Sequence, residues 1–497
     1  MKQKNYVIGY CGLFFFFLST MAYAQLPYDN TAVSEEEFSL FEGSGIVNFK
    51  PHGIELTTGA NQTNGVFLEE VIFASERGFI LGFDYLMTGV GGNSTDRGAN
   101  GIALVLFDAS VKDLKIGSKT AGLGYSYSNA VNTNQAVPGF TKGFLSIGLD
   151  LYGDSKNRKK LDNEFRNGIE IPSKQNNHIT VRGQGDKLEG YPVYISQSVT
   201  NIEERYKLNL HTGEYTQNFE MPDPNGFRFK LRENNISNEL DLNASFGHPS
   251  YRRVIVSLLP AKKLHDIGFY LNVDMIYGNK TSRIINSFFI PSEDMIKYQE
   301  ASSTTANVLK EKWISTPALF KVGFTATTGT IYQKQIIRNI KINLPFAPIV
   351  KDVEAPNACI DHITTIDVLM NSIGFDTNKY VGGQDIASLG SNEHLDPFSF
   401  QFLTLVDSEL RNTLEPYVAM TEAGRYEYSP ITKQVVFIPK NGMTSTEDTI
   451  YFSIKNKRKV IGGTDLGGEQ YRSEGAKIKL NFTHTCNSII MVNGSAL

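Results

Sequence analysis

The chain has 497 residues, of which 41% are apolar, 20% charged and 11% aromatic, so it can bury a sizeable core and is not disordered. Its 48 basic and 52 acidic residues give a net charge of −4, and a short basic cluster such as 455–459 is too small for a nucleic-acid surface. Nucleic acid is therefore not expected as a partner, and the 44 glycines and many aromatic residues favour strands and turns.

The first 24 residues have the pattern of an export signal. Lys2 and Lys4 provide a positive start, residues 6–18 form an apolar run, and Ala22 and Ala24 complete a small-x-small cleavage pattern. The apolar run is shorter than the roughly 20 residues that a membrane-spanning helix needs. We therefore expect segment 1–24 to be removed, and the mature chain to be exported without a transmembrane helix.

Residues 38–344 carry short alternating apolar runs separated by Gly, Asn, Asp and Pro, which is typical of an antiparallel β domain. The segment from about 185 to 250 is more polar and shows no clear hydrophobic period, so we expect it to be an insertion of long loops and a few strands. A helical period is plausible only at 291–300 and 406–414.

Three prolines mark the exit from this region, at Pro345, Pro348 and Pro356. They predict a first domain at 26–345, a linker at 346–356 and a second domain at 357–497. The second domain returns to β patterning, so the fold class we expect is all-β throughout.

Three motifs of the first domain resemble the legume-type (L-type) lectin family and occur in that family's order. Residues 99–108 look like its "ADG-I/L-A-F-x-L" strand, residues 122–125 and 144–154 are similar to its "LGL … V-E-F-D-x-Y-x-N", and residues 319–342 look like its "VGFSASTG … HEI". The resemblance implies a concanavalin A-like jelly-roll sandwich. The variants look most like bacterial surface versions, so the implied location is the extracellular space or the surface of a bacterium.

The resemblance also implies a Ca²⁺ ion held by Asp150, the carbonyl of Tyr152 and Asp154, which match the family's Asp-x-aromatic-x-Asn/Asp pattern. Carboxylate and carbonyl oxygens are the ligands that this hard cation prefers. Gly148 stands where the family has the Glu of a transition-metal site, so we expect no second metal and an ordinary strand or turn role for His178. The alternative for the two aspartates is a polar turn without a metal.

For sugar contacts, the resemblance points to Asn100, Gly122 and Tyr125. Asn100 stands where the family has an Asp that accepts hydrogen bonds from sugar hydroxyls. Its amide can both accept and donate such bonds, but it carries no charge. This departure leaves open whether sugar binding survives in this chain, and most aromatic residues at such spacings fill a β core.

One pair of carboxylates, Glu239 and Asp241, is compatible with glycosidase activity. Glycosidases on a concanavalin-type sandwich place carboxylates on one strand as Glu-x-Asp-x-x-Glu, and alternation sends them into one cleft. The third carboxylate would fall at Ala244, so we favour a solvated turn and expect no catalytic residues.

The second domain resembles bacterial immunoglobulin-like or cadherin-like adhesin modules. Residues 366–371 resemble their "V-L-A-N-D" start, and residues 424–428, 435–439 and 449–454 look like their following strands. The resemblance implies an immunoglobulin-like β sandwich that serves as a stalk or spacer.

Once Cys11 is removed with the export signal, Cys359 and Cys486 remain as an even pair in an exported chain. We expect a disulfide between them, because the first and last strands of such a sandwich can lie near each other. Two unpaired buried thiols are the alternative.

These observations predict an exported, non-catalytic binding protein that recognises a glycan, or another extracellular ligand, through its first domain. The alternatives are a structural or adhesion protein whose lectin-like fold has lost sugar binding and, last, a glycoside hydrolase. The oligomeric state stays open.

Overall fold

The computed structural model describes residues 28–30, 34–91, 99–130, 135–157, 164–169, 176–201, 203–217, 229–232, 242–301, 307–406, 409–457, 471–483 and 491–492. The expected export signal, Cys486 and the pair Glu239 and Asp241 lie outside these ranges. Within them the chain forms strands and short 3₁₀ turns, and no helix there is long and apolar enough to cross a lipid bilayer. The all-β prediction is confirmed.

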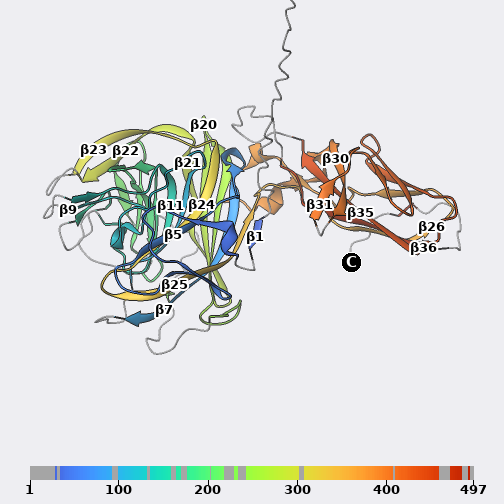
Figure 1. Cartoon of the computed structure of the whole chain (residues 1–497). Helices are drawn as coiled ribbons and strands as arrows, with labels where there is room; N and C mark the ends of the chain where they lie inside the picture. The colour runs from blue at the N-terminus through green and yellow to red at the C-terminus, as the bar shows by residue number, and fades with distance from the viewer. Residues whose placement is uncertain are drawn as a thin grey trace, which may run out of the picture.

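Strands between residues 28 and 343 form a sandwich of two large sheets, drawn from blue to yellow in Figure 1. The eight-stranded sheet has the order β21 (Lys280–Pro291), β20 (Asp266–Tyr277), β19 (Arg252–Lys263), β7 (Phe79–Gly91), β25 (Tyr332–Asn343), β4 (Gly53–Thr57) and β3 (Asn48–Lys50), with β1 (Tyr28–Asn30) beside β25. The twelve-stranded sheet has the order β18 (Tyr215–Gln217), β17 (Arg205–Leu208), β16 (Val193–Ser198), β13 (His178–Arg182), β11 (Gly143–Asp150), β8 (Gly101–Asp108), β24 (Leu319–Thr327), β5 (Thr63–Leu68) and β2 (Phe38–Leu40), with β14 (Gly185–Asp186), β15 (Glu189–Gly190) and β6 (Phe73–Ala74) attached.

Smaller elements complete this sandwich. β9 (Ser128–Ala130), β10 (Gln135–Val137) and β12 (Glu164–Phe165) form a small sheet, and β22 (Glu293–Ala301) pairs with β23 (Asn307–Ser315) as a long hairpin. The 3₁₀ turns of the described chain are η1 (Glu35–Glu37), η2 (Ser75–Arg77), η3 (Thr120–Gly122), η4 (Thr377–Lys379), η5 (Ile386–Leu389) and η6 (Asn392–His394).

Strand β8 has apolar side chains on both faces, and both faces are buried in the fold. Ile102, Leu104 and Leu106 face the main core between the two large sheets. Ala103, Val105 and Phe107 alternate with them and face a second core, which loop residues from 114 to 140 and Tyr191 cover. The twelve-stranded sheet is therefore buried on its outer face as well, under loops that also build the candidate site.

Strands between residues 353 and 492 form a smaller sandwich, orange to red in Figure 1. One sheet has the order β26 (Val353–Cys359), β36 (Ala476–Thr483), β35 (Glu447–Asn456), β30 (Leu395–Val406) and β31 (Glu409–Asn412). The other has the order β32 (Val418–Met420), β33 (Gly424–Ser429), β34 (Gln434–Pro439), β27 (Thr364–Asp367) and β37 (Met491–Val492), and β28 (Gly374–Phe375) pairs separately with β29 (Gly390–Ser391). Its core is formed by residues between 353 and 480, but that this sandwich belongs to the immunoglobulin-like or cadherin-like modules stays a prediction.

Two local predictions were wrong. Most of the segment 291–300 belongs to strand β22 and not to a helix, because Ile296 and Tyr298 alternate into the core beside the paired strand β23. Residues 409–412 of the second expected helix are strand β31. The few strands described in the first part of the expected 185–250 insertion, β14 to β18, belong to the twelve-stranded sheet.

The segment 346–356 is not a free linker. The side chain of Phe346 is fully buried, and strand β26 already begins at Val353. Phe346 packs edge-on against Tyr380 and Tyr471, in a cluster that also includes Tyr270 of β20. The two sandwiches are therefore joined by an aromatic contact.

Candidate functional site

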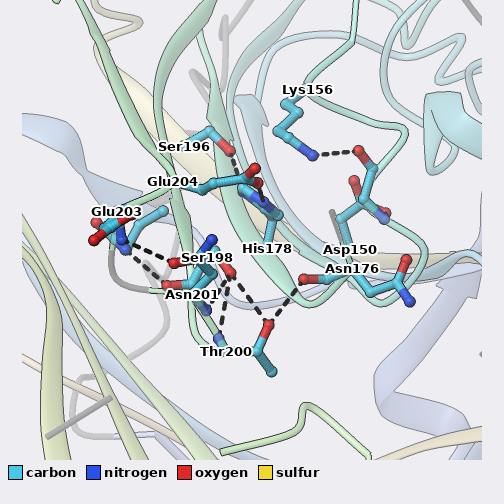
Figure 2. A network of polar contacts seen from close by, with 12 residues as sticks. Asp150, Lys156, Asn176, His178, Ser196, Ser198, Thr200, Asn201, Glu203 and Glu204 are labelled. Atoms are coloured by element: carbon cyan, nitrogen blue, oxygen red, sulfur yellow. Dashed lines mark hydrogen bonds and ion pairs between the residues drawn. The ribbon is translucent and has the colours of Figure 1, made fainter. Parts of the chain in front are cut away.

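The candidate site lies on the outer face of three neighbouring strands, β11, β13 and β16. The register aligns Asp150 of β11 with His178 of β13, and His178 in turn with Ser198 of β16. The residues that alternate with them, such as Leu149 and Ile179, point into the main core. A row of polar side chains thus lies opposite the core, and the loops that follow β11 and β16 cover it (Figure 2).

The Asp150 carboxylate closes the loop that follows β11. It is 1% exposed, and its two oxygens accept hydrogen bonds from the backbone N–H groups of Gly153 at 2.7 Å and Ser155 at 2.6 Å. Burial raises the pKa of Asp150 to about 6, the positive charge of Lys156 opposes this rise, and the nearby carboxylate of Asp154 adds to it. The loop is therefore folded around a carboxylate that backbone donors already bind.

Lys156 returns from the same loop and places its ammonium group beside these carboxylates. Its side chain is fully buried, and its Nζ donates a hydrogen bond of 2.6 Å to the carbonyl of Gly153. Asp150, Glu204 and Asp154 are the negative charges that act on it. Burial lowers the pKa of Lys156, and these three carboxylates counteract that effect.

Further buried charges balance the cluster. Arg166 and Arg182 are both fully buried, and Arg182 lies within the electrostatic reach of Arg166 and Asp150. The guanidinium group of Arg182 donates to the backbone carbonyls of Asn167, Tyr191 and Ser155. Besides Lys156, Arg182 therefore provides a second buried positive charge that acts on Asp150.

The residues expected to hold Ca²⁺ do not fit that ion in this arrangement. Asp150 and Asp154 are both buried and lie close together, as expected, but a protein ammonium group stands beside them. A Cβ at Gly148 would lie 2.9 Å from the Leu123 side chain, so a carboxylate there would displace that side chain.

His178, Ser196 and Glu204 have the residue types of a hydrolytic triad. The Nδ1 atom of His178 lies 3.0 Å from the Ser196 hydroxyl, and its Nε2 atom lies 3.4 Å from a Glu204 carboxylate oxygen. However, Ser196 and His178 are fully buried, and burial with the positive charge of Lys156 holds the pKa of His178 well below its usual value. No substrate can reach this serine in the observed fold, so the arrangement is structural, as expected for His178.

Asn100 is the expected sugar contact that remains partly exposed. Its backbone carbonyl accepts a hydrogen bond from Leu151, which anchors it to the loop after β11. A Cβ built on Gly329 would lie 3.7 Å from the Asn100 side-chain oxygen and 3.9 Å from the Thr120 methyl group. We call Asn100, Thr120, Tyr152 and Gly329 the loop face; Tyr152, next to Leu151, is also partly exposed.

Hydroxyl groups from strand β24 fix the loop that contributes Thr120. Thr327 donates to the carbonyl of Thr120 at 2.8 Å, and Thr325 donates to the carbonyl of Leu123 at 2.6 Å. Thr120 has a φ of +55°, a strained conformation for a β-branched residue. The loop face is thus built on rigid, tied-down backbone.

Tyr125 and Gly122 are not at the loop face. The ring of Tyr125 is 1% exposed, packs in the second core against Phe140 and Tyr191, and directs its hydroxyl to the carbonyl of Gly183. No ring face is left for stacking on a sugar, so this prediction was wrong. Gly122 is buried too, and its small size is explained by Ser118, whose Oγ would lie 2.0 Å from an added Cβ.

In the second sandwich, Cys359 is disulfide-bonded in the structure. Strand β26, which ends at Cys359, runs parallel to β36 and pairs Cys359 with Thr483, three residues before Cys486 in the sequence. Cys486 lies outside the described residues, so its identity as the partner stays a prediction. Asp361 and His362 lie near the sulfur, but a sulfur in a disulfide is no thiolate ligand for a metal.

A large cavity lies elsewhere in the first sandwich, where both sheets end. It measures about 850 Å³ and lies beside β17 of one sheet and β21, the outermost strand of the other. Core residues form its apolar lining, and Lys207, Lys263, His211 and Asn286 are among its polar groups. Its size suits a small ligand, so it is the natural alternative location for binding.

Sequence reasoning missed the buried cations. A lysine two residues after an aspartate normally lies in solvent, and nothing in its spacing shows that Lys156 turns inward. The burial of Tyr125, however, could have been predicted from the sequence of a neighbouring strand. Six consecutive apolar residues, 102–107, indicate a strand covered on both faces, and that strand needs aromatic side chains from neighbouring loops as its cover.

Among known proteins, similarity to this chain is found only in comparisons with solved structures. No protein-family model matches the chain, and no curated protein matches it. The Ca²⁺/Man-bound form of the VIP36 exoplasmic/lumenal domain has a TM-score of 0.33 and 12% identity, over 62% of this chain and 83% of that one. Peanut lectin with a 9mer peptide also has a TM-score of 0.33 and 12% identity, over 64% and 96%. The metal-free form of the Emp46p carbohydrate recognition domain has a TM-score of 0.30 and 10% identity, over 64% and 95%.

Proposed function

We propose that this chain is an exported, non-catalytic binding protein that recognises a glycan through the loop face of its first sandwich. The observation that carries the proposal is the placement of Asn100. Asn100 is partly exposed, and its backbone carbonyl accepts a hydrogen bond from the N–H of Leu151, which holds its position. An amide both donates and accepts hydrogen bonds, as sugar hydroxyls do, so the two are chemically complementary.

The rigidity of the surrounding loops favours recognition over a merely structural role. The Thr325 and Thr327 hydroxyls tie down the loop that carries Thr120, and the buried Asp150 carboxylate ties down the loop that carries Tyr152. Loops fixed before binding lose little conformational entropy when a ligand arrives, which favours affinity. Under this proposal the second sandwich acts as a spacer that presents the first.

A glycan array tests this function with matched amide variants. The wild-type mature protein, Asn100→Ala and Asn286→Ala are applied under identical conditions; Asn286 lies in the 850 Å³ cavity and serves as the control. We expect wild type and Asn286→Ala to bind the same glycans, and Asn100→Ala to lose about tenfold or more in affinity, as a lost hydrogen bond that leaves polar groups unpaired does.

Two results would contradict the proposal. If wild type binds no glycan, the chain is the structural or adhesion protein that the sequence left as an alternative. If Asn286→Ala loses binding and Asn100→Ala keeps it, the ligand occupies the cavity and not the loop face.

A further inference from the structure

We propose that the ammonium group of Lys156 is a built-in replacement for a bound cation, so that the loop after β11 folds without calcium. The inference rests on the buried charges alone and holds whether or not the loop face binds a glycan.

The groups around Lys156 are those that a hard cation would use. Calcium takes oxygens from carboxylates and backbone carbonyls. Lys156 donates to the carbonyl of Gly153 at 2.6 Å and is stabilised by the negative charges of Asp150, Glu204 and Asp154. Figure 2 shows Lys156 near the loop that carries Asp150. Three carboxylates thus act on one positive charge that belongs to the chain itself, and a loop carbonyl accepts its hydrogen bond.

The coordination of calcium would be hard to complete beside this ammonium. Calcium requires six to eight oxygens, and the ammonium group of Lys156 already donates to the loop carbonyl that would be one of them, that of Gly153. Arg182 adds a second positive charge that acts on the Asp150 carboxylate. A divalent ion would have to bind beside these buried cations, and their repulsion opposes it.

The positive charge of Lys156 is covalently attached to the chain, unlike that of a bound ion. A bound ion can be removed by a chelator, whereas a lysine side chain cannot leave the fold. Because Lys156 follows Asp154 by two residues, the loop carries its own cation as it folds. The loop face next to it should therefore keep its shape at any calcium concentration.

Thermal unfolding with and without calcium tests the inference on the full mature chain. The melting temperature of wild type should be the same in excess CaCl₂ as in excess EDTA. A site that binds Ca²⁺ to the native state at a hundredfold excess over Kd would instead raise it by about 5 °C. Such a rise would overturn the proposal, and this comparison needs no variant to fold.

The variant Lys156→Ala provides the second test, with the exposed Lys119→Ala as its matched control. Removing the buried ammonium leaves the carboxylates uncompensated, so we expect the melting temperature to fall by about 5–10 °C, with no fall in Lys119→Ala. Excess CaCl₂ should restore part of the loss in Lys156→Ala, since the space and the oxygens are then free for a cation. If Lys156→Ala is as stable as Lys119→Ala, or if calcium restores nothing, the ammonium does not stand in for a cation.

Discussion

Gly101 shows how a single residue positions the candidate site. It begins β8 with a φ of +148°, and a Cβ there would lie 2.0 Å from the carbonyl oxygen of Leu149 on β11. This close approach of two backbones is open to glycine alone. It also holds the preceding residue, Asn100, where its carbonyl can accept the N–H of Leu151.

The exchange Gly101→Ala should therefore destabilise the first sandwich. We expect the free energy of unfolding to fall by about 2–4 kcal/mol, because the added methyl group meets backbone that cannot rotate away. Gly59→Ala is the control, since its Cβ would meet nothing nearer than 3.7 Å, and its cost should stay within about 0.5 kcal/mol. Urea unfolding measures both variants, and equal stabilities would refute this account of Gly101.

Among the secondary-structure elements, the strands with clear apolar patterns could be predicted from the sequence. The structure of other segments depends on the strands and loops that they contact in the fold. The continuous apolar run at 101–107 predicts a strand covered on both faces, and the alternating run at 321–326 predicts a strand with one apolar face; they form β8 and β24. The segment 291–300 became β22 because pairing with β23 buries Ile296 and Tyr298, and a sequence window does not contain that partner strand. The same holds for the candidate site. The resemblance to a family motif pointed to Asp150 and Asp154, whereas the burial of Lys156 and Arg182 depends on how distant loops close over β11 and β13.

The pairing of β26 with β36 leads to a prediction for the second sandwich. These strands are parallel neighbours that end at Cys359 and Thr483, so a bridge to Cys486 would join their ends. It would close a loop of roughly 130 positions, which stabilises the fold by up to about 4–5 kcal/mol on the chain-entropy model. Thiol titration of the denatured mature protein should find no free thiol, and a reductant should lower the unfolding temperature. Two titratable thiols would show that the bridge is absent.

At the scale of the molecule, the two sandwiches are held together by more than the chain between them. The Tyr471 hydroxyl donates to the carbonyl of Arg77 at 2.5 Å, and the amide of Asn456 donates to the carbonyl of Phe346 at 2.8 Å. Together with the aromatic packing of Phe346, these bonds favour a fixed orientation of one sandwich on the other. A rigid spacer of this kind would present the loop face in a defined direction, which suits a protein that binds at a surface.

The most direct measurement is a glycan array of the wild-type mature protein, read once in excess EDTA and once in excess CaCl₂. We expect binding to the same glycans at the same strength in both buffers, because in the proposed site Asn100 makes the contact and Lys156 supplies the positive charge that keeps the loop folded. Binding that appears in calcium and vanishes in EDTA would contradict it, as would the absence of any bound glycan in both.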